Sequence, residues 1–95
     1  MTAQPVDPVI ADIREQITAV DEQLVALVNR RIAAVARIRV RKAEVGVDFF
    51  DPDREARLLQ HLQDGNAGPL SAAGLAELHA FILELAKREA SGVGR

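Results

Sequence analysis

Cysteine, tryptophan and tyrosine are missing from the 95-residue sequence, and phenylalanine occurs only three times. The lack of cysteine excludes disulfides and thiolate metal ligands. His61 and His79 cannot complete a typical zinc site by themselves, so we expect no metal and interpret both as surface or groove-edge residues. Four prolines and six glycines fall at apparent boundaries of elements. The apolar 48% is mostly Ala, Leu, Ile and Val, which is typical of packed helices.

No stretch of the sequence favours a membrane or an export signal. The apolar runs are far shorter than the roughly 18 residues of a membrane span. The N-terminal "MTAQPVDPVI" lacks a basic segment followed by an apolar one, which a signal peptide needs. We therefore expect a soluble cytoplasmic protein that forms a single domain at this length.

A long first helix is predicted from Asp7-Pro8, a capping residue followed by the favoured first helical residue. Apolar residues then step by three and four along one face: Ile10, Ile13, Ile17, Val20, Leu24 and Leu27. No proline or glycine follows until Gly46, so the helix has about 38 residues and a length of roughly 57 Å. Such a helix cannot bury its apolar face against the short remainder of its own chain. We therefore expect a homodimer.

Two shorter helices complete the prediction. Asp51-Pro52 starts one that runs to about Gln63, and Ser71 caps another that runs to about Ala90. The turn-forming "DGNAGP" joins them, and no strand pattern occurs. The expected fold class is all-α, with three helices per chain in an intertwined antiparallel dimer. Residues 1–7 are expected to form a flexible leader, residues 8–90 the domain, and residues 91–95 a flexible tail.

Half of the twelve lysines and arginines lie in "RRIAAVARIRVRK", residues 30–42. Many of these side chains are explained simply as solvent-exposed charges. Arg31 differs, because it continues the apolar face of the helix, where burying an unpaired charge lowers stability. Lys42 follows eleven residues later, almost a whole number of turns, and so lies on the same face. Two cations on one inward face predict a site for an anion, although a snorkelling or ion-paired Arg31 is the alternative. In an antiparallel dimer, Arg14 of one chain can approach Arg31 of the other.

Nucleic acid and membrane surfaces are the rival partners for a basic run. The net charge is −2, no aromatic residue stands among the cations, and no nucleic-acid-binding motif occurs. The apolar face of the helix is better explained as a dimer contact than as a membrane contact. We therefore expect neither partner, and a small anionic substrate instead.

Three segments together resemble the all-helical chorismate mutases. They are "IREQITAVDEQLVALVNRRIAAVARIRVRKAEVG", "FFDPDREARLLQHL" and "GPLSAAGLAELHAFILELAKR", which cover most of residues 9–90. The most specific element is the ordered set Ile13-Arg14, Asp21, Arg31, Lys42 and "DPDRE" at residues 51–55. The resemblance implies an entwined dimer of three-helix subunits. It also implies the Claisen rearrangement of chorismate to prephenate in the shikimate pathway of aromatic amino acid biosynthesis, without metal or cofactor.

The resemblance also implies a role for each matching residue. Arg31 and the partner chain's Arg14 would bind the two carboxylates of this dianionic substrate, and Lys42 would donate to the ether oxygen and a carboxylate. Asp51, mainly through its backbone, and Glu55 would hold the substituent at ring carbon four. Arg54 would brace that end of the pocket, with Phe49 and Phe50 packed beneath the turn. Fixed cations suit this chemistry, because a pericyclic step needs only a positioned substrate and charge stabilisation at oxygen.

The third helix departs from the family pattern. The family usually carries a serine and, four residues later, a glutamine that reaches the ether oxygen, and Ala86 and Ala90 occupy these positions here. Neither alanine can donate a side-chain hydrogen bond, so Lys42 is left as the main donor. The protein is then a mutase of modest activity, or a mutase that converts 4-amino-4-deoxychorismate to 4-amino-4-deoxyprephenate. It could also be a weakly active subunit that binds and regulates another pathway enzyme, and nothing favours an isochorismate lyase.

Overall fold

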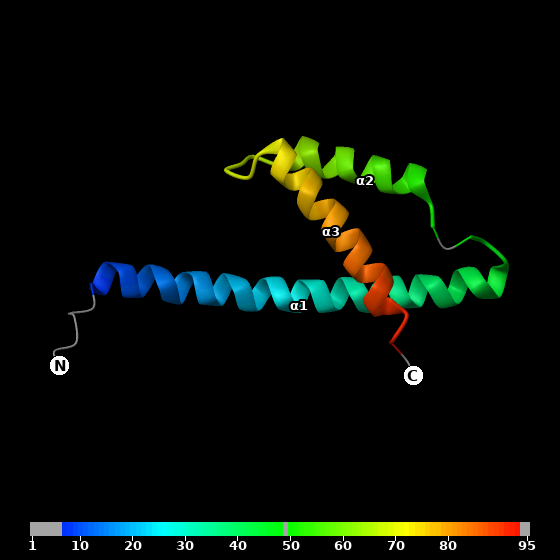
Figure 1. Cartoon of the computed structure of the whole chain (residues 1–95), viewed down its shortest axis with the longest axis horizontal. Coiled ribbons are helices and arrows are strands. Elements are labelled where there is room, and N and C mark those ends of the chain that lie inside the picture. The colour runs from blue at the N-terminus through cyan, green and yellow to red at the C-terminus, as the bar shows by residue number, and fades with distance from the viewer. Residues whose placement is uncertain (1–6, 49, 94–95) are drawn as a thin grey trace. The chain divides into compact units, whose positions relative to one another are not determined.

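A computed structural model describes residues 7–48 and 50–93 of the chain. Its elements are three α-helices in the order α1 (Pro8–Val45), α2 (Pro52–Gly65) and α3 (Ala72–Ala90) (Figure 1). The predicted all-α class with a long first helix is confirmed, and the described residues contain no strand. The leader at residues 1–6 and the tail at residues 94–95 lie outside the described residues.

The chain divides into two compact units between Arg30 and Arg31, within α1. In the first unit Asp7 caps α1, because its carboxylate accepts from the backbone N–H groups of Val9 (2.8 Å) and Ile10 (3.1 Å). The predicted apolar face is present on this helix, but its side chains are about half exposed: Ile10, Ile13, Ile17, Val20, Leu24 and Leu27. None of the described residues of the unit covers them, which is the situation expected of a helix that packs against another chain.

The second unit begins with the remaining part of α1, which ends as predicted at Gly46. This glycine has a φ of 74°, in the left-handed region that favours glycine. The N–H of Val47 donates to the carbonyl of Lys42 over 2.9 Å, closing the hydrogen-bonded turn typical of a glycine-terminated helix. The helix therefore ends at Val45, only three residues after Lys42.

Helix α2 begins as its sequence predicts, with Asp51 as the cap and Pro52 as the first helical residue. The Asp51 carboxylate accepts from the backbone N–H of Arg54 over 3.1 Å. The helix continues to Gly65, two residues beyond the predicted end at Gln63, and the side-chain amide of Asn66 then donates to the carbonyl of Leu70 over 2.8 Å. The loop is therefore organised by asparagine, a common turn residue.

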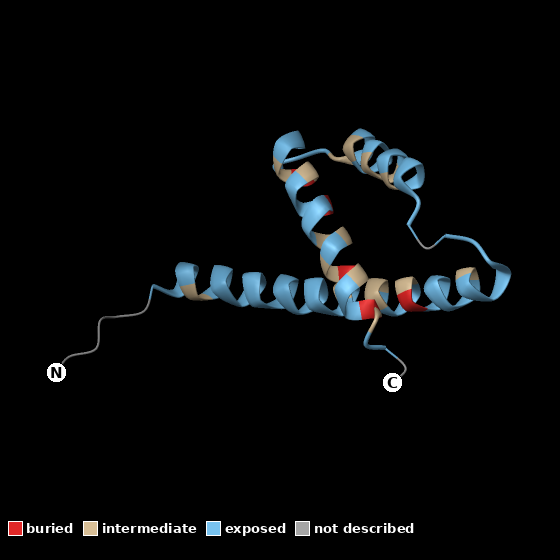
Figure 2. Cartoon of the chain, turned by 45° about the vertical axis from the view of Figure 1, so that its right-hand side comes forward, coloured by how far each residue is buried: buried red, intermediate tan, exposed pale blue. Residues whose placement is uncertain are grey.

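Helix α3 carries most of the core of the second unit. Ser71 caps it through a 3.0 Å hydrogen bond from the N–H of Gly74 to the serine hydroxyl, and the Gln63 side chain of α2 donates to the carbonyl of Ala72. Figure 2 shows buried positions on α3 and on the part of α1 that belongs to this unit. They are Ala36, Leu75, His79, Ala86 and Ala90. Because none of the described larger side chains is fully buried, the core is thin and built mainly from small residues.

Among the described residues, no helix has the length and apolar character required to cross a lipid bilayer.

Candidate active site

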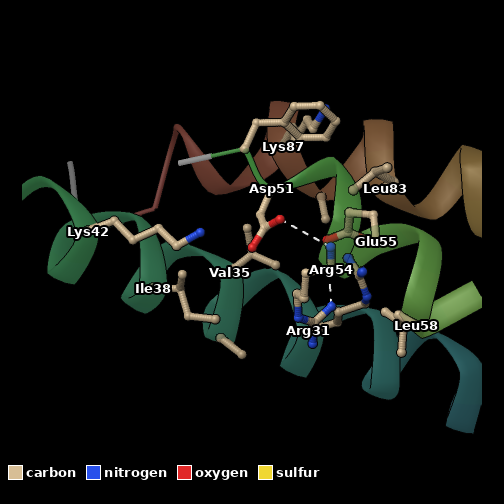
Figure 3. Close-up of a pocket in the computed structure, with 13 residues that line it drawn as sticks. Arg31, Val35, Ile38, Lys42, Asp51, Arg54, Glu55, Leu58, Leu83 and Lys87 are labelled. Atoms are coloured by element: carbon tan, nitrogen blue, oxygen red, sulfur yellow. Dashed lines mark hydrogen bonds and ion pairs between the residues drawn. The ribbon is translucent and has the colours of Figure 1, made fainter. Parts of the chain in front are cut away.

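A pocket of about 200 Å³ lies within the second unit, between the end of α1, the start of α2 and the second half of α3 (Figure 3). Its walls combine apolar side chains with several charged ones, a composition typical of small-molecule sites. Thirteen residues line it: Arg31, Ala34, Val35, Ile38, Lys42, Phe50, Asp51, Arg54, Glu55, Leu58, Leu83, Ala86 and Lys87.

Helix α1 contributes Arg31 and Lys42, the two cations whose spacing predicted a common face. Between them lie Val35 and Ile38, which form an apolar floor (Figure 3). One terminal nitrogen of Arg31, Nη1, is buried and has no hydrogen-bond partner among the described residues. A buried guanidinium N–H without a partner is costly, so this group is poised to donate to an anion that enters the pocket.

The first turn of α2 forms the opposite wall. Asp51 lines the pocket and uses one carboxylate oxygen to cap the helix. Glu55 is mostly buried, with 19% of its side chain exposed, whereas the Arg54 side chain is 54% exposed. Arg54 Nη1 lies 3.6 Å from Glu55 Oε1, so the two side chains form an ion pair at this end of the pocket.

The second oxygen of Glu55 faces a buried histidine of α3. Glu55 Oε2 lies 3.5 Å from His79 Nε2, and both atoms are buried without a hydrogen bond. The interpretation of His79 as a surface or groove-edge residue is wrong, because only 9% of the residue is exposed. The spacing of four from the buried Leu75 was the signal that places it on the apolar face of α3.

Helix α3 contributes Leu83, Ala86 and Lys87 to the third wall. Lys87 is a residue that the sequence reasoning missed. Its ammonium nitrogen lies 3.8 Å from the centre of the Phe50 ring, a cation–π contact, and 3.7 Å from a carboxylate oxygen of Glu84. Lys87 follows Ala86 directly and stands one helical turn after Leu83, so the pocket face of α3 could have indicated it.

Six of the eight sequence-predicted site residues line this one pocket: Arg31, Lys42, Asp51, Arg54, Glu55 and Ala86. Ala90 is 3% exposed and packs in the core rather than among the lining residues. Arg14 belongs to the first unit. Phe50 lines the pocket and is 48% exposed, so it contacts Lys87 through its ring instead of packing fully beneath the turn. Phe49 lies outside the described residues.

The charges of the lining are unequal. Arg31, Lys42, Arg54 and Lys87 supply four cations against the two carboxylates of the α2 turn, a formal excess of two positive charges. A pocket of this kind favours an anion that carries two negative charges. Across residues 7–48 and 50–93, no group of three or more His, Cys, Asp or Glu side chains has a geometry that could hold a metal ion.

Comparison with known proteins gives a family and a relative to which this chain is similar. The family model described as chorismate mutase type II matches residues 13–90. The bifunctional chorismate mutase/prephenate dehydratase of Stutzerimonas stutzeri is 35% identical over 77 residues. That match covers 75% of this chain but 21% of the relative, so the chain spans about a fifth of the relative's length.

Proposed function

The chain belongs to the chorismate mutase type II family, and we propose that its pocket rearranges chorismate to prephenate. The predicted resemblance and the predicted enzyme class, an isomerase of the chorismate mutase type, are confirmed by the family match. The observation that carries the proposed reaction is the pocket itself. It brings Arg31, Lys42 and Glu55 from two helices around one cavity, with a buried arginine nitrogen that lacks a partner.

The proposed mechanism rests on position and charge alone. The rearrangement breaks a C–O bond and forms a C–C bond within one molecule, and negative charge grows on the ether oxygen as the bond breaks. Lys42 donates to that oxygen, while the guanidinium fork of Arg31 holds a carboxylate. The apolar floor at Val35 and Ile38 keeps the substrate in the folded shape from which the new bond forms.

The α2 turn is proposed to hold the ring end of the substrate. Glu55 accepts a hydrogen bond from the substituent at ring carbon four, and Asp51 contributes through its backbone because one of its carboxylate oxygens already caps the helix. Arg54 braces Glu55 from outside. The excess of two positive charges in the lining supports a substrate with two carboxylates.

The exposed apolar face of α1 supports a homodimer. Six large apolar side chains of the first unit, from Ile10 to Leu27, are each between 48% and 54% exposed. A second copy that packs its α1 alongside would cover them, and the Arg14 of that copy would then complete the pocket with a third carboxylate-binding cation. Sedimentation at micromolar concentration should give twice the 10.3 kDa chain mass, and a stable helical monomer would contradict the dimer.

The reaction is tested by a substrate panel of chorismate, 4-amino-4-deoxychorismate and isochorismate, with identification of each product. Prephenate formed from chorismate at a rate well above the uncatalysed one supports the proposal. Turnover of none of the three would contradict it and favour a binding or regulatory role toward another pathway enzyme.

The position of Arg14 is tested by mixing two inactive variants, Arg14→Ala and Lys42→Met, and refolding them together. In a heterodimer one pocket collects both substitutions and the other collects neither. We expect activity to return, up to about half of wild type per heterodimer, because distant sites act independently. If heterodimers form and stay inactive, Arg14 does not act across the interface.

A further inference from the structure

The contact between His79 and Glu55 lies directly behind the ring-binding wall of the pocket. The proposed chemistry does not use this histidine. Nevertheless, His79 is only 9% exposed, and its Nε2 lies 3.5 Å from the carboxylate of Glu55, which lines the pocket. We infer that His79 is a positioning residue that orients Glu55 to accept from a hydroxyl group. On this inference, which rests on the proposed function, the pocket prefers a hydroxyl to an ammonium group at ring carbon four.

The two facing atoms are chemically matched. A carboxylate oxygen only accepts hydrogen bonds, whereas a histidine ring nitrogen that carries hydrogen donates one. Both atoms are buried and neither makes a hydrogen bond to a described residue, and the 3.5 Å contact sets each atom opposite the other. Leaving both unsatisfied would destabilise the pocket wall, and a small approach of the two side chains with hydrogen on Nε2 would satisfy both.

The surroundings of Glu55 determine what the remaining lone pairs can bind. Oε1 lies 3.6 Å from the Arg54 guanidinium and Oε2 lies 3.5 Å from His79, so donors already flank the carboxylate on both sides. An ammonium group at ring carbon four would have to enter this wall beside Arg54, in a lining that already has more cations than carboxylates. A neutral hydroxyl meets no such repulsion and still donates one hydrogen bond to Glu55.

A purely structural histidine would fill space on the apolar face of α3 between Leu75 and Leu83. Such a residue could be replaced by any side chain of similar size. A positioning residue must instead keep a donor at the place of Nε2. Glutamine tests this difference, because its side-chain NH₂ can occupy nearly the same place as Nε2, whereas leucine supplies bulk without a donor.

The experiment compares His79→Leu and His79→Gln with the wild type on chorismate and on 4-amino-4-deoxychorismate. We expect wild type to prefer chorismate in kcat/KM. His79→Leu should lose about tenfold or more on chorismate and less on the amino analogue, so the preference shrinks. His79→Gln should retain the preference, and His61→Leu, which changes the exposed histidine, should match wild type.

Two kinetic results would overturn the inference: an equal loss on both substrates in His79→Leu, or a loss of preference in His79→Gln equal to that in His79→Leu. Wild-type preference for the amino analogue would also overturn it, while leaving the mutase chemistry standing. Circular dichroism of each variant confirms that the helices have formed before rates are compared.

A second measurement does not depend on turnover or on the folding of a His79 variant. The protein contains two histidines, so ¹⁵N NMR of the imidazole groups in wild type and in Glu55→Gln reports on each. We expect the His79 resonances to shift when Glu55 becomes neutral and those of His61 to stay unchanged. Unchanged His79 resonances would overturn the inference. If wild type turns over none of the substrates, the proposed function fails, and this measurement still decides whether His79 and Glu55 are coupled.

Discussion

Replacing Arg31 by methionine separates a functional charge from a structural one. Arg31 lies at the pocket wall of α1, and its Nη1 is buried without a hydrogen-bond partner among the residues that the structure describes. A structural arginine in such a place would be paired, because an unpaired buried donor lowers stability. Methionine keeps an unbranched side chain of similar reach and removes only the charge and the donors.

The expected effects on stability and on turnover have opposite signs. Removing the unsatisfied N–H relieves a desolvation cost of about 1 kcal/mol, so the free energy of unfolding should stay the same or rise by about that amount. Losing the charge-assisted hydrogen bonds to a substrate carboxylate in a desolvated site costs about 3 kcal/mol, which is roughly 150-fold in kcat/KM. We therefore expect Arg31→Met to be a stable and nearly inactive protein.

The assay combines urea unfolding, at one fixed protein concentration because a dimer unfolds in a concentration-dependent way, with steady-state kinetics on chorismate. Arg30→Met is the matched control, since it makes the same substitution at the exposed neighbouring position. It should leave both quantities near wild type. A fall of 2 kcal/mol or more in the unfolding free energy of Arg31→Met, with turnover retained, would refute the reasoning and make Arg31 a structural ion.

Two further cations can be tested in the same way. Lys42→Met should lower kcat by about 100-fold or more with unchanged helix content, since it removes the proposed donor to the ether oxygen. Normal turnover by a variant whose circular dichroism spectrum matches that of wild type would exclude that role. The control is Arg41→Met, at an exposed residue that pairs with Glu44. Lys87→Met should raise KM for chorismate about 3- to 10-fold, because a partly exposed cation contributes modestly to binding a dianion. An unchanged KM would exclude Lys87 from the site, and Arg88→Met, at the exposed next position, is its control.

The helices could be predicted because their signals are local. Asp7, Asp51 and Ser71 each accept a backbone hydrogen bond at the start of the helix that they were expected to cap. Gly46 ends α1 at the predicted place, for its conformation is one that few other residues adopt. The end of α2 was predicted two residues early, since the signal there was a composition of turn formers rather than one defined stop.

The site was predictable in part, for a related reason. Arg31 and Lys42 share a face because of helix geometry, and the spacing alone places them together. Lys87 and His79 depend on how α3 rotates against α2, which no local spacing fixes. The burial of His79 follows from the apolar face of α3, but its approach to Glu55 is a tertiary contact that becomes visible only when the two helices are packed.

The final prediction concerns the two alanines that stand where the family has hydrogen-bonding side chains. Ala86 lines the pocket, so Ala86→Ser adds a small hydrogen-bond donor to the pocket wall. A hydrogen bond that forms mainly in the transition state is worth about 1 to 3 kcal/mol, so kcat should rise roughly 5- to 150-fold. Ala90 is 3% exposed and lies outside the lining, so the larger side chain in Ala90→Gln should overpack the core and lower the unfolding free energy by about 1 to 3 kcal/mol without a gain in rate. Kinetics on chorismate and urea unfolding of both variants distinguish the two positions. A faster and equally stable Ala90→Gln protein would mean that position 90 reaches the substrate in the assembled dimer, and the modest activity expected of this chain would then come from the loss of that side chain.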